Sequence, residues 1–437
     1  MPISSRCRFD RFWPTLAVLT AVALSSTETR AQIPPELPMS SRTGVGVRAL
    51  GMGGAYGALS HDLAGLHYNA AGLAGTRRGE FSLSFERRNV DSETEYLGNR
   101  ESTSFDKTRL HSAGFVYPFP TVQGSLVLAA AYQQTAPFDL EYLRIGSGGE
   151  IESEEEFISE QGSARAYRVG LGWDVAPNLS LGLTGALFGG DSSRSRDFFY
   201  TGSNGDSEDT VTDIESDLHG FTGSFGAQYR AENDVTLGLS VNFPESYTLE
   251  GRFKDDVIRY EQIPGDTLFY VDDYIDEFDF KDKITMPWRF TGSAAYEKRE
   301  FALTADVTFT DWTDIDYDGP IKVGRDFAYR STFDFRIGAE YHPFRQPWSL
   351  RGGYAYVPLA YDVIATDVFF GDTEQADFAR ENQFFSLGAG VILDRSLFLD
   401  AAYLFGGYER SGRSLLGETV EKQDEQKLLL SVTYRSS

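Results

Sequence analysis

Residues 41–74 read SRTGVGVRALGMGGAYGALSHDLAGLHYNAAGLA, a composition that suits neither a stable helix nor a well-packed strand. Glycine recurs through the stretch, at Gly44, Gly46, Gly51, Gly53, Gly54, Gly57 and Gly65. Such a backbone can turn tightly and approach other surfaces closely, but its ordering costs entropy that only enclosure can offset. The sequence that follows has the pattern of such an enclosure.

A dinucleotide-binding loop is one alternative, because Gly51, Gly53 and Gly57 come close to its glycine fingerprint. The last glycine is one residue late, no apolar strand precedes the loop, and no βαβ unit follows it. We therefore do not interpret this stretch as a nucleotide site.

The N-terminal residues 1–31 have the pattern of a secretory signal peptide. Three arginines precede a short apolar run at 12–24, and small and polar residues follow up to Ala31. The apolar run is too short for a membrane-spanning helix. We expect the mature chain to begin at Gln32. Cys7 is the only cysteine and lies in the removed part, so the mature chain has no disulfide and no cysteine-ligated metal.

The composition favours a transmembrane β-barrel. The 437 residues include 14% aromatics and 44 glycines, and no apolar run of 18 residues follows the signal peptide. A barrel has such weak hydropathy because every second residue of each strand faces the lumen. The formal net charge of −25 excludes nucleic acid as a partner. The acidic stretches at 150–160, 206–215 and 272–279 are expected to be solvated loops.

Fourteen segments alternate between apolar and polar residues, which predicts an all-β, 14-stranded antiparallel barrel. They lie at 79–89, 108–117, 124–135, 164–175, 178–189, 217–231, 234–250, 283–297, 300–312, 331–342, 347–357, 383–393, 396–408 and 427–435. Short and long connections alternate between them, as expected for periplasmic turns and outer loops. An even number of strands also leaves both ends of the chain on the periplasmic side.

The two faces of a strand separate clearly after residue 300, where Phe301, Leu303 and Val307 share one face and Thr304 and Asp306 share the other. Lipid must meet the apolar face, because a charge there costs about 2–4 kcal/mol near the midplane. The same parity turns charges of both signs inward: Arg168, Asp174, Arg230, Arg289, Arg336, Glu340, Arg351 and Asp400. A soluble β-sandwich or propeller would show similar alternation, but the signal peptide and the alternating connections favour a barrel.

Residues 48–62, RALGMGGAYGALSHD, and 68–74, YNAAGLA, resemble the mature N-terminus of FadL-type outer-membrane transporters. In that family the segment is a hatch folded into the barrel. The resemblance implies a signal peptide at 1–31, an N-terminal hatch at 32–78 and a barrel at 79–437. The family's Asn-Pro-Ala-Gly reads here as Asn69-Ala-Ala-Gly72, without the proline.

The resemblance also implies a function. The protein would lie in the bacterial outer membrane as a multi-pass barrel and would transport hydrophobic small molecules, either long-chain fatty acids or aromatic hydrocarbons. These would bind near the hatch and leave sideways through the wall. The hatch and ligand-binding residues implied are Arg48, Gly51, Gly53, Gly54, Asn69 and Gly72.

The third predicted strand is the predicted exit. Val127, Ala129 and Ala131 lie on its inner face, where a water-filled lumen would have polar groups. In FadL-type barrels this strand is kinked and opens the wall, so the resemblance favours an exit here. Alternatively, these small residues accommodate the packed hatch.

The expected partners are a hydrophobic small-molecule ligand, outer-membrane lipids and the barrel assembly machinery, and the protein is expected to be a monomer. A different function is also open, since related barrels act as surface-attachment or shuttle factors in protein secretion. In that case the outer loops would carry the function without solute transport.

Neither a cofactor nor an enzymatic activity is predicted. Asp314, Asp316 and Asp318 with the following glycine match the first half of a calcium-binding loop. The twelfth position is Arg325 instead of glutamate, so a metal site would need ligands from other loops. The five histidines are scattered, and His111 beside a serine is too weak a pairing to indicate catalysis.

Overall fold

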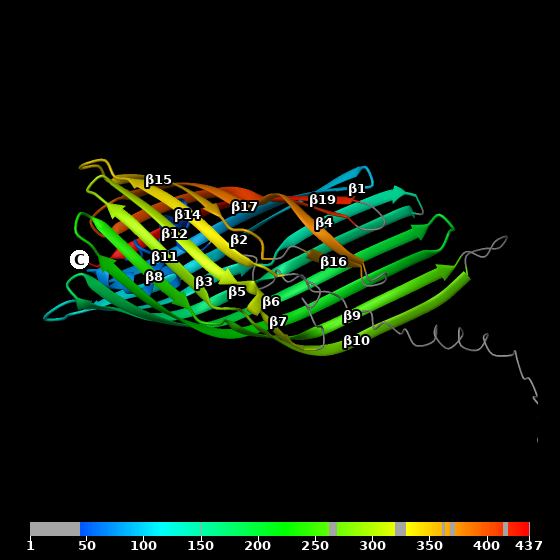
Figure 1. Ribbon diagram of the computed structural model, residues 1–437, viewed down its shortest axis with the longest axis horizontal. Helices are drawn as coiled ribbons and strands as arrows, with labels where there is room; N and C mark the ends of the chain where they lie inside the picture. Colours follow the sequence, from blue (N-terminus) through cyan, green and yellow to red (C-terminus); the bar gives the residue numbers. More distant parts are fainter. Residues whose placement is uncertain are drawn as a thin grey trace, which may run out of the picture.

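The structure is a computed structural model that describes residues 44–149, 151–261, 269–319, 329–360, 363–367, 372–413 and 418–436. These residues form an elongated antiparallel β-barrel (Figure 1). The predicted signal peptide and the first part of the predicted hatch, up to residue 43, lie outside the described residues.

Within the described ranges, no helix is both long enough and apolar enough to cross a membrane.

The sheet has 19 strand segments, and five of the barrel strands are each made of two consecutive segments, so the wall has 14 strands. The interrupted strands are β3 with β4, β8 with β9, β10 with β11, β12 with β13, and β15 with β16. The segments are β1 (Glu80–Tyr96), β2 (Asn99–Phe119), β3 (Leu126–Pro137), β4 (Leu140–Gly148), β5 (Ile151–Ala176), β6 (Leu179–Gly202), β7 (Ser207–Arg230), β8 (Val235–Asn242), β9 (Ser246–Glu261), β10 (Phe269–Thr285), β11 (Arg289–Glu297), β12 (Phe301–Asp311), β13 (Asp316–Asp318), β14 (Ser331–Tyr341), β15 (Trp348–Tyr356), β16 (Val363–Asp367), β17 (Asp372–Ile392), β18 (Leu397–Arg413) and β19 (Glu418–Arg435).

The barrel closes where β1 pairs with β19, in a register that runs from Glu80↔Arg435 to Tyr96↔Thr419. Each of the fourteen predicted segments overlaps one of the fourteen strands, so the predicted fold class is confirmed. The short turns also fall where expected, for example between β5 and β6 and between β17 and β18.

The prediction of long acidic loops is wrong. The stretches 150–160, 206–215 and 272–279 lie largely within β5, β7 and β10. β5 has 26 residues, whereas about 9–11 residues suffice to cross the hydrocarbon core, so the wall extends far beyond it. The alternation of apolar and polar residues does not predict these extensions, because acidic residues stand on both of their faces. The backbone ladder nevertheless continues through them.

The turn between β1 and β2 illustrates the same correction. A loop was expected at 90–107, but the two strands run on to a two-residue turn at Leu97 and Gly98. Both residues have positive φ, 48° and 82°, a combination that matches the right-handed twist of a tight hairpin.

The outer face of the wall carries an apolar belt. On β12 the exposed residues Phe301, Leu303 and Val307 alternate with buried Thr304 and Asp306, as predicted. Large apolar side chains are exposed around the barrel, including Phe81, Phe115, Leu171, Leu183, Leu239, Phe290, Phe335, Leu387, Phe405 and Leu430. Such a belt on a closed sheet is the surface that a bilayer solvates.

We expect Val307→Lys to destabilise the barrel by about 2–4 kcal/mol, because it places a charge on the lipid-facing belt. Equilibrium unfolding in lipid vesicles would measure the loss. Ile275→Lys is the matched control, since Ile275 is exposed among acidic residues of β10 beyond the belt. Equal losses in the two variants would contradict the position assigned to the bilayer.

Candidate functional site

Residues 44–75 cross the lumen, and we call them the luminal segment. They form α1 (Val47–Gly51), α2 (Gly65–Tyr68) and the 3-10 helix η1 (Ala70–Gly75), and most of their side chains are buried. α1 contacts β15, β17 and β18, whereas η1 contacts β5, β6 and β7. Figure 1 shows the segment in blue, toward the end of the barrel that carries the C-terminus.

Inward-facing polar side chains bind the irregular backbone of the luminal segment. Asp306 of β12 accepts hydrogen bonds from the N–H groups of Tyr56 and Gly57, both at 2.9 Å. Gln228 of β7 donates to the carbonyl of Gly57 at 2.8 Å. Ser386 of β17 accepts from the N–H of the luminal Gly53 at 2.8 Å. Because buried backbone groups need partners, these wall residues fix the path of the segment.

Arg48 anchors the luminal segment by a two-pronged ion pair with Glu340 of β14. Its Nη2 and Nε atoms donate to the two carboxylate oxygens at 2.7 and 3.0 Å. Glu340 also accepts from Arg351 Nε and lies 2.8 Å from His342 Nε2. Arg351 donates in turn to Asp400 at 2.6 Å. Predicted inward charges of both signs therefore form one network beneath the segment.

Asn69 and the predicted glycines all lie in contact regions of the segment. Asn69 is 2% exposed and donates to the carbonyls of Ala227 and Leu239 at 3.1 and 3.3 Å. Gly53 has φ 67°, and a Cβ there would lie 2.7 Å from the amide nitrogen of Tyr354. Gly72 has no positive φ, but a Cβ would lie 2.4 Å from the carbonyl oxygen of Ser60.

Gly51 and Gly54 complete the set of predicted segment glycines. Gly54 has a positive φ of 73°, and a Cβ on Gly51 would lie 3.2 Å from the Cα of Gly388 in β17. The luminal segment therefore contacts the wall through its backbone.

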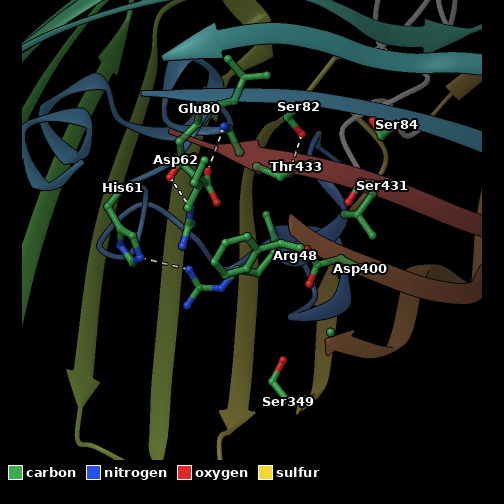
Figure 2. A pocket seen from close by; sticks show the side chains of 18 of the residues that line it. Arg48, His61, Asp62, Glu80, Ser82, Ser84, Ser349, Asp400, Ser431 and Thr433 are labelled. Carbon is green, nitrogen blue, oxygen red and sulfur yellow. Dashed lines mark hydrogen bonds and ion pairs between the residues drawn. The ribbon is translucent and has the colours of Figure 1, made fainter. Parts of the chain in front are cut away.

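A cavity of about 440 Å³, lined by hydroxyl and charged groups as well as apolar side chains, lies between the luminal segment and the inner faces of β1, β15, β17, β18 and β19. Figure 2 shows the hydroxyl and charged groups that line it. Ser82 and Thr433 share a hydrogen bond of 2.9 Å, and Arg48 Nη1 lies 3.0 Å from His61 Nε2. This side of the segment suits water or polar groups.

Apolar side chains gather farther along the lumen, on the other side of the luminal segment. A cluster of buried side chains, mainly from β5, β6, β7, β9 and β10 with others from β3 and from residues outside the strands, lies in the lumen there, and we call it the apolar cluster. It includes Ala136, Phe138, Ala164, Ala166, Ala186, Phe188, Ile214, Leu218, Tyr247, Leu249, Phe253, Phe280, Ile284, Met286 and Trp312. Between the cluster and the segment lies a small cavity of about 100 Å³, which charged residues such as Arg289, Asp306 and Arg336 line together with members of the cluster.

Sequence reasoning missed the apolar cluster. Strand parity indicates that residues such as Phe188 and Tyr247 face inward. The depth at which each lies depends on the tilt and register of the strands, which no local pattern gives.

The predicted exit residues Val127, Ala129 and Ala131 face inward on β3 and are buried. They pack in one cluster with Leu63, Leu66, Ala70, Leu73 and Val116. In this structure the small residues accommodate the luminal segment, which was the alternative interpretation. A sideways exit at this place stays a prediction.

The ladder of the wall is interrupted beside β3. β2 pairs with β3 only from Ser112↔Gln133 to Phe119↔Leu126. Further along, β4 pairs with β5, and in the part of the chain that the structure describes no strand pairs over 99–111 with the edge of β2 opposite β1. Thr103 of β2 donates instead to the carbonyl of Glu141 in β4, at 2.7 Å. We call this interruption between β2 and β4 the seam.

Ion pairs bridge the seam at Asp139, which is 4% exposed between β3 and β4. Arg109 of β2 donates to both carboxylate oxygens, and Lys107 Nζ lies 3.3 Å from one of them. Burial alone would raise the pKa of Asp139, but these two cations outweigh it and lower the pKa below its ordinary value of 3.8. Side-chain charges therefore hold the wall together where the backbone ladder is missing.

The three predicted calcium ligands do not converge. Asp314 ends the short 3-10 helix η2 (Trp312–Asp314), Asp316 and Asp318 lie on β13, and all three are exposed. Over the described residues, no group of three or more His, Cys, Asp or Glu side chains could hold a metal ion. The calcium site stays an untested prediction.

We expect Arg48→Met to loosen the luminal segment by about 1.5–3 kcal/mol, because charge-assisted hydrogen bonds to the buried Glu340 are lost. Hydrogen exchange of peptides from residues 44–75 should become faster. Arg100→Met is the control, since it breaks only an exposed pair with Glu93 and Glu95. Unchanged exchange in Arg48→Met would show that the backbone contacts alone hold the segment.

Three solved structures share this architecture. The chain is similar to a Pseudomonas aeruginosa FadL homologue, with a TM-score of 0.64, 15% identity, and coverage of 93% of this chain and 99% of that one. It is also similar to the Pseudomonas putida toluene transporter TodX, with a TM-score of 0.65, 15% identity, and coverage of 90% of this chain and 99% of that one. The third is the Ralstonia pickettii toluene transporter TbuX, with a TM-score of 0.54, 13% identity, and coverage of 90% of this chain and 99% of that one. At such low identity the likeness is one of fold, and it confirms a FadL-like barrel.

No curated protein sequence matches this chain. A family model does match: the model for BamG aligns with residues 52–350, from the luminal segment to β15. The matched range covers well over half of the chain, and it includes the luminal segment from residue 52 onward and most of the wall that encloses it. This protein therefore belongs to the BamG family.

Proposed function

We propose that this protein transports hydrophobic small molecules across the bacterial outer membrane. The observation that carries the proposal is the apolar cluster on the inner face of the wall. A water-filled pore has a polar lumen, because every inward side chain meets solvent. Phe188, Leu218 and Phe253 are instead at most 6% exposed, and they belong to one apolar cluster that spans several strands. Such a lining favours an apolar solute.

The luminal segment supports a route that is not straight. It lies between the apolar cluster and the 440 Å³ cavity, where an apolar solute would have to desolvate hydroxyl and charged groups. The inner face of β3, which lies next to the seam, offers the alternative of leaving sideways into the membrane. In the proposed route the solute enters from the extended end of the barrel, binds at the cluster and leaves beside Val127, Ala129 and Ala131.

The test is to measure uptake of radiolabelled dodecane, toluene and dodecanoate by cells with and without the gene. Faster uptake of at least one solute in cells that carry the protein is the expected result. Mass spectrometry of the protein purified in mild detergent should also find a co-purified apolar compound. Equal uptake in both strains, with no such compound, would overturn the proposal.

Membership of the BamG family favours a second candidate function. The name points to the barrel assembly machinery, so the protein would act in the assembly or secretion of outer-membrane proteins. Here the long extensions of β5, β6 and β7 beyond the belt would carry the contacts. Affinity purification after mild cross-linking distinguishes the two: stoichiometric assembly components support this candidate, and their absence alongside active uptake supports transport.

We expect Ala129→Trp to slow uptake strongly, because the indole would fill the inner space beside Leu63 and Leu66. The barrel should still assemble, as judged by a heat-dependent shift on a denaturing gel. Ala130→Trp is the matched control, since the neighbouring residue faces outward. If Ala129→Trp fails to assemble, Ala129→Leu serves instead. Normal uptake in an assembled Ala129 variant would remove this strand from the route.

We expect Asp139→Asn to open the seam about ten to a hundred times more readily, because about 1.5–3 kcal/mol of charge-assisted hydrogen bonding is lost. Hydrogen exchange of residues 140–148 measures the opening. Asp174→Asn is the control, since it breaks a comparable pair with Arg230 at the other end of the barrel. Unchanged exchange in Asp139→Asn would mean that the ion pairs do not close the seam.

The pH dependence of the seam follows from the same ion pairs. Because the pKa of Asp139 is lowered, its contribution to stability is complete above the ordinary value of 3.8 and is lost only as pH falls through the lower one. Exchange of residues 140–148, corrected for its intrinsic rate, should therefore be constant from pH 7 to pH 5. A marked acceleration within that range would contradict this assignment.

A further inference from the structure

Two short turns at the end of the barrel that carries the C-terminus bring three cations together (Figure 1). Lys298 and Arg299 lie in the turn between β11 and β12, and Arg345 lies in the turn between β14 and β15. The N–H of His342 donates to the carbonyl of Glu300 at 2.6 Å, which joins the two turns. All three cationic residues are exposed, and we call them the basic cluster.

The two arginines of the basic cluster share one aromatic ring. The guanidinium carbon of Arg299 lies 3.7 Å from the ring centre of Phe344, and that of Arg345 lies 5.1 Å from it. Lys298 Nζ lies 5.6 Å from the ring centre of Tyr296. Among the described residues, no carboxylate forms an ion pair with any of the three cations. Like charges held at one ring repel each other, so the arrangement suits an anion between the two guanidinium groups.

The backbone of Arg345 is strained. Its φ is 63°, in the left-handed region that residues with a Cβ rarely adopt. A glycine would relieve this strain, whereas an arginine places a cation beside Phe344. Strained backbone that persists in a folded protein is typical of functional positions.

The apolar belt begins directly beside the basic cluster. Phe301 pairs with Tyr341 across β12 and β14, and the two residues are 37% and 49% exposed. Trp348 of β15 is 39% exposed, and its ring centre lies 6.4 Å from that of Tyr341. Aromatic side chains at the edge of a membrane belt lie at the level of the lipid headgroups. The cations just beyond them therefore reach the phosphates of lipids whose tails meet the belt.

Other short turns do not combine charge in this way. The turn at 231–234 contains two acidic residues, the turns at 120–125 and 177–178 contain no charged residue, and the turn at 394–396 contains one charge of each sign. Attraction for an anion is thus concentrated in one sector of the rim.

We propose that the basic cluster binds the headgroup of an anionic phospholipid on the outer surface of the barrel. The phosphate lies between Arg299 and Arg345, because the planar fork of a guanidinium matches two phosphate oxygens. Lys298 adds a third positive charge, and the acyl chains lie along the exposed aromatic residues of the belt. This site is on the outside of the wall, so it does not depend on the solute that the lumen carries.

The test is native mass spectrometry of the full-length protein in a neutral detergent. The protein is titrated with phosphatidylglycerol and with phosphatidylcholine of identical acyl chains, which has no net charge. The wild type should bind one phosphatidylglycerol at least about tenfold more tightly than phosphatidylcholine. The double variant Arg299→Gln, Arg345→Gln should lose this preference.

Arg345→Gly provides a second variant that folds without strain, since glycine readily adopts positive φ. It should bind phosphatidylglycerol about fivefold more weakly, as expected for the loss of one cation near an anionic lipid. The heat-dependent gel shift confirms that each variant is assembled.

The double variant Arg77→Gln, Arg78→Gln is the matched control, because it removes the same charge from two exposed residues that precede β1. It should leave the preference unchanged, and equimolar inorganic phosphate should not displace the lipid. Equal affinity of the wild type for the two lipids, a preference retained in Arg299→Gln, Arg345→Gln, an equal loss in the control or displacement by phosphate would overturn the lipid site.

Discussion

The fold depends on satisfying the backbone of an irregular, glycine-rich segment inside a closed wall. A chain buried in the lumen cannot leave its N–H and C=O groups without partners. The wall supplies them from inward positions: Asp306 binds two N–H groups, Gln228 a carbonyl, and Ser386 a further N–H group. Glu340 adds the ion pair with Arg48. These side chains explain why a lumen of this size is filled by protein.

The luminal segment divides the lumen into two environments. Hydroxyl and charged groups stand among the lining residues of the 440 Å³ cavity on one side, and the apolar cluster lies on the other, beyond the partly charged lining of the 100 Å³ cavity. An apolar solute is stabilised when it leaves water for apolar surroundings, and hydroxyl and charged groups offer it no such gain. The proposed sideways route follows from this division.

The seam lies in the extended part of the wall, where the strands are longest. The wall continues far beyond the membrane belt, and there it is no longer held by a complete backbone ladder. Between β2 and β4, Asp139 with Arg109 and Lys107 replaces the missing hydrogen bonds. An ion pair can separate without breaking a β-ladder, so the wall is easiest to open at this place.

The sequence alone determined the barrel, its fourteen strands and the face that each residue presents, because side-chain direction in a strand has a strict period of two. It also indicated that Arg48 and Asn69 belong to an enclosed segment. Only the tertiary structure decided that the acidic stretches are strands, since acidic residues on both faces remove the alternation of apolar and polar residues. It alone placed Asp139 at the seam opposite Arg109 and Lys107, because such partners come from different strands and depend on register and tilt.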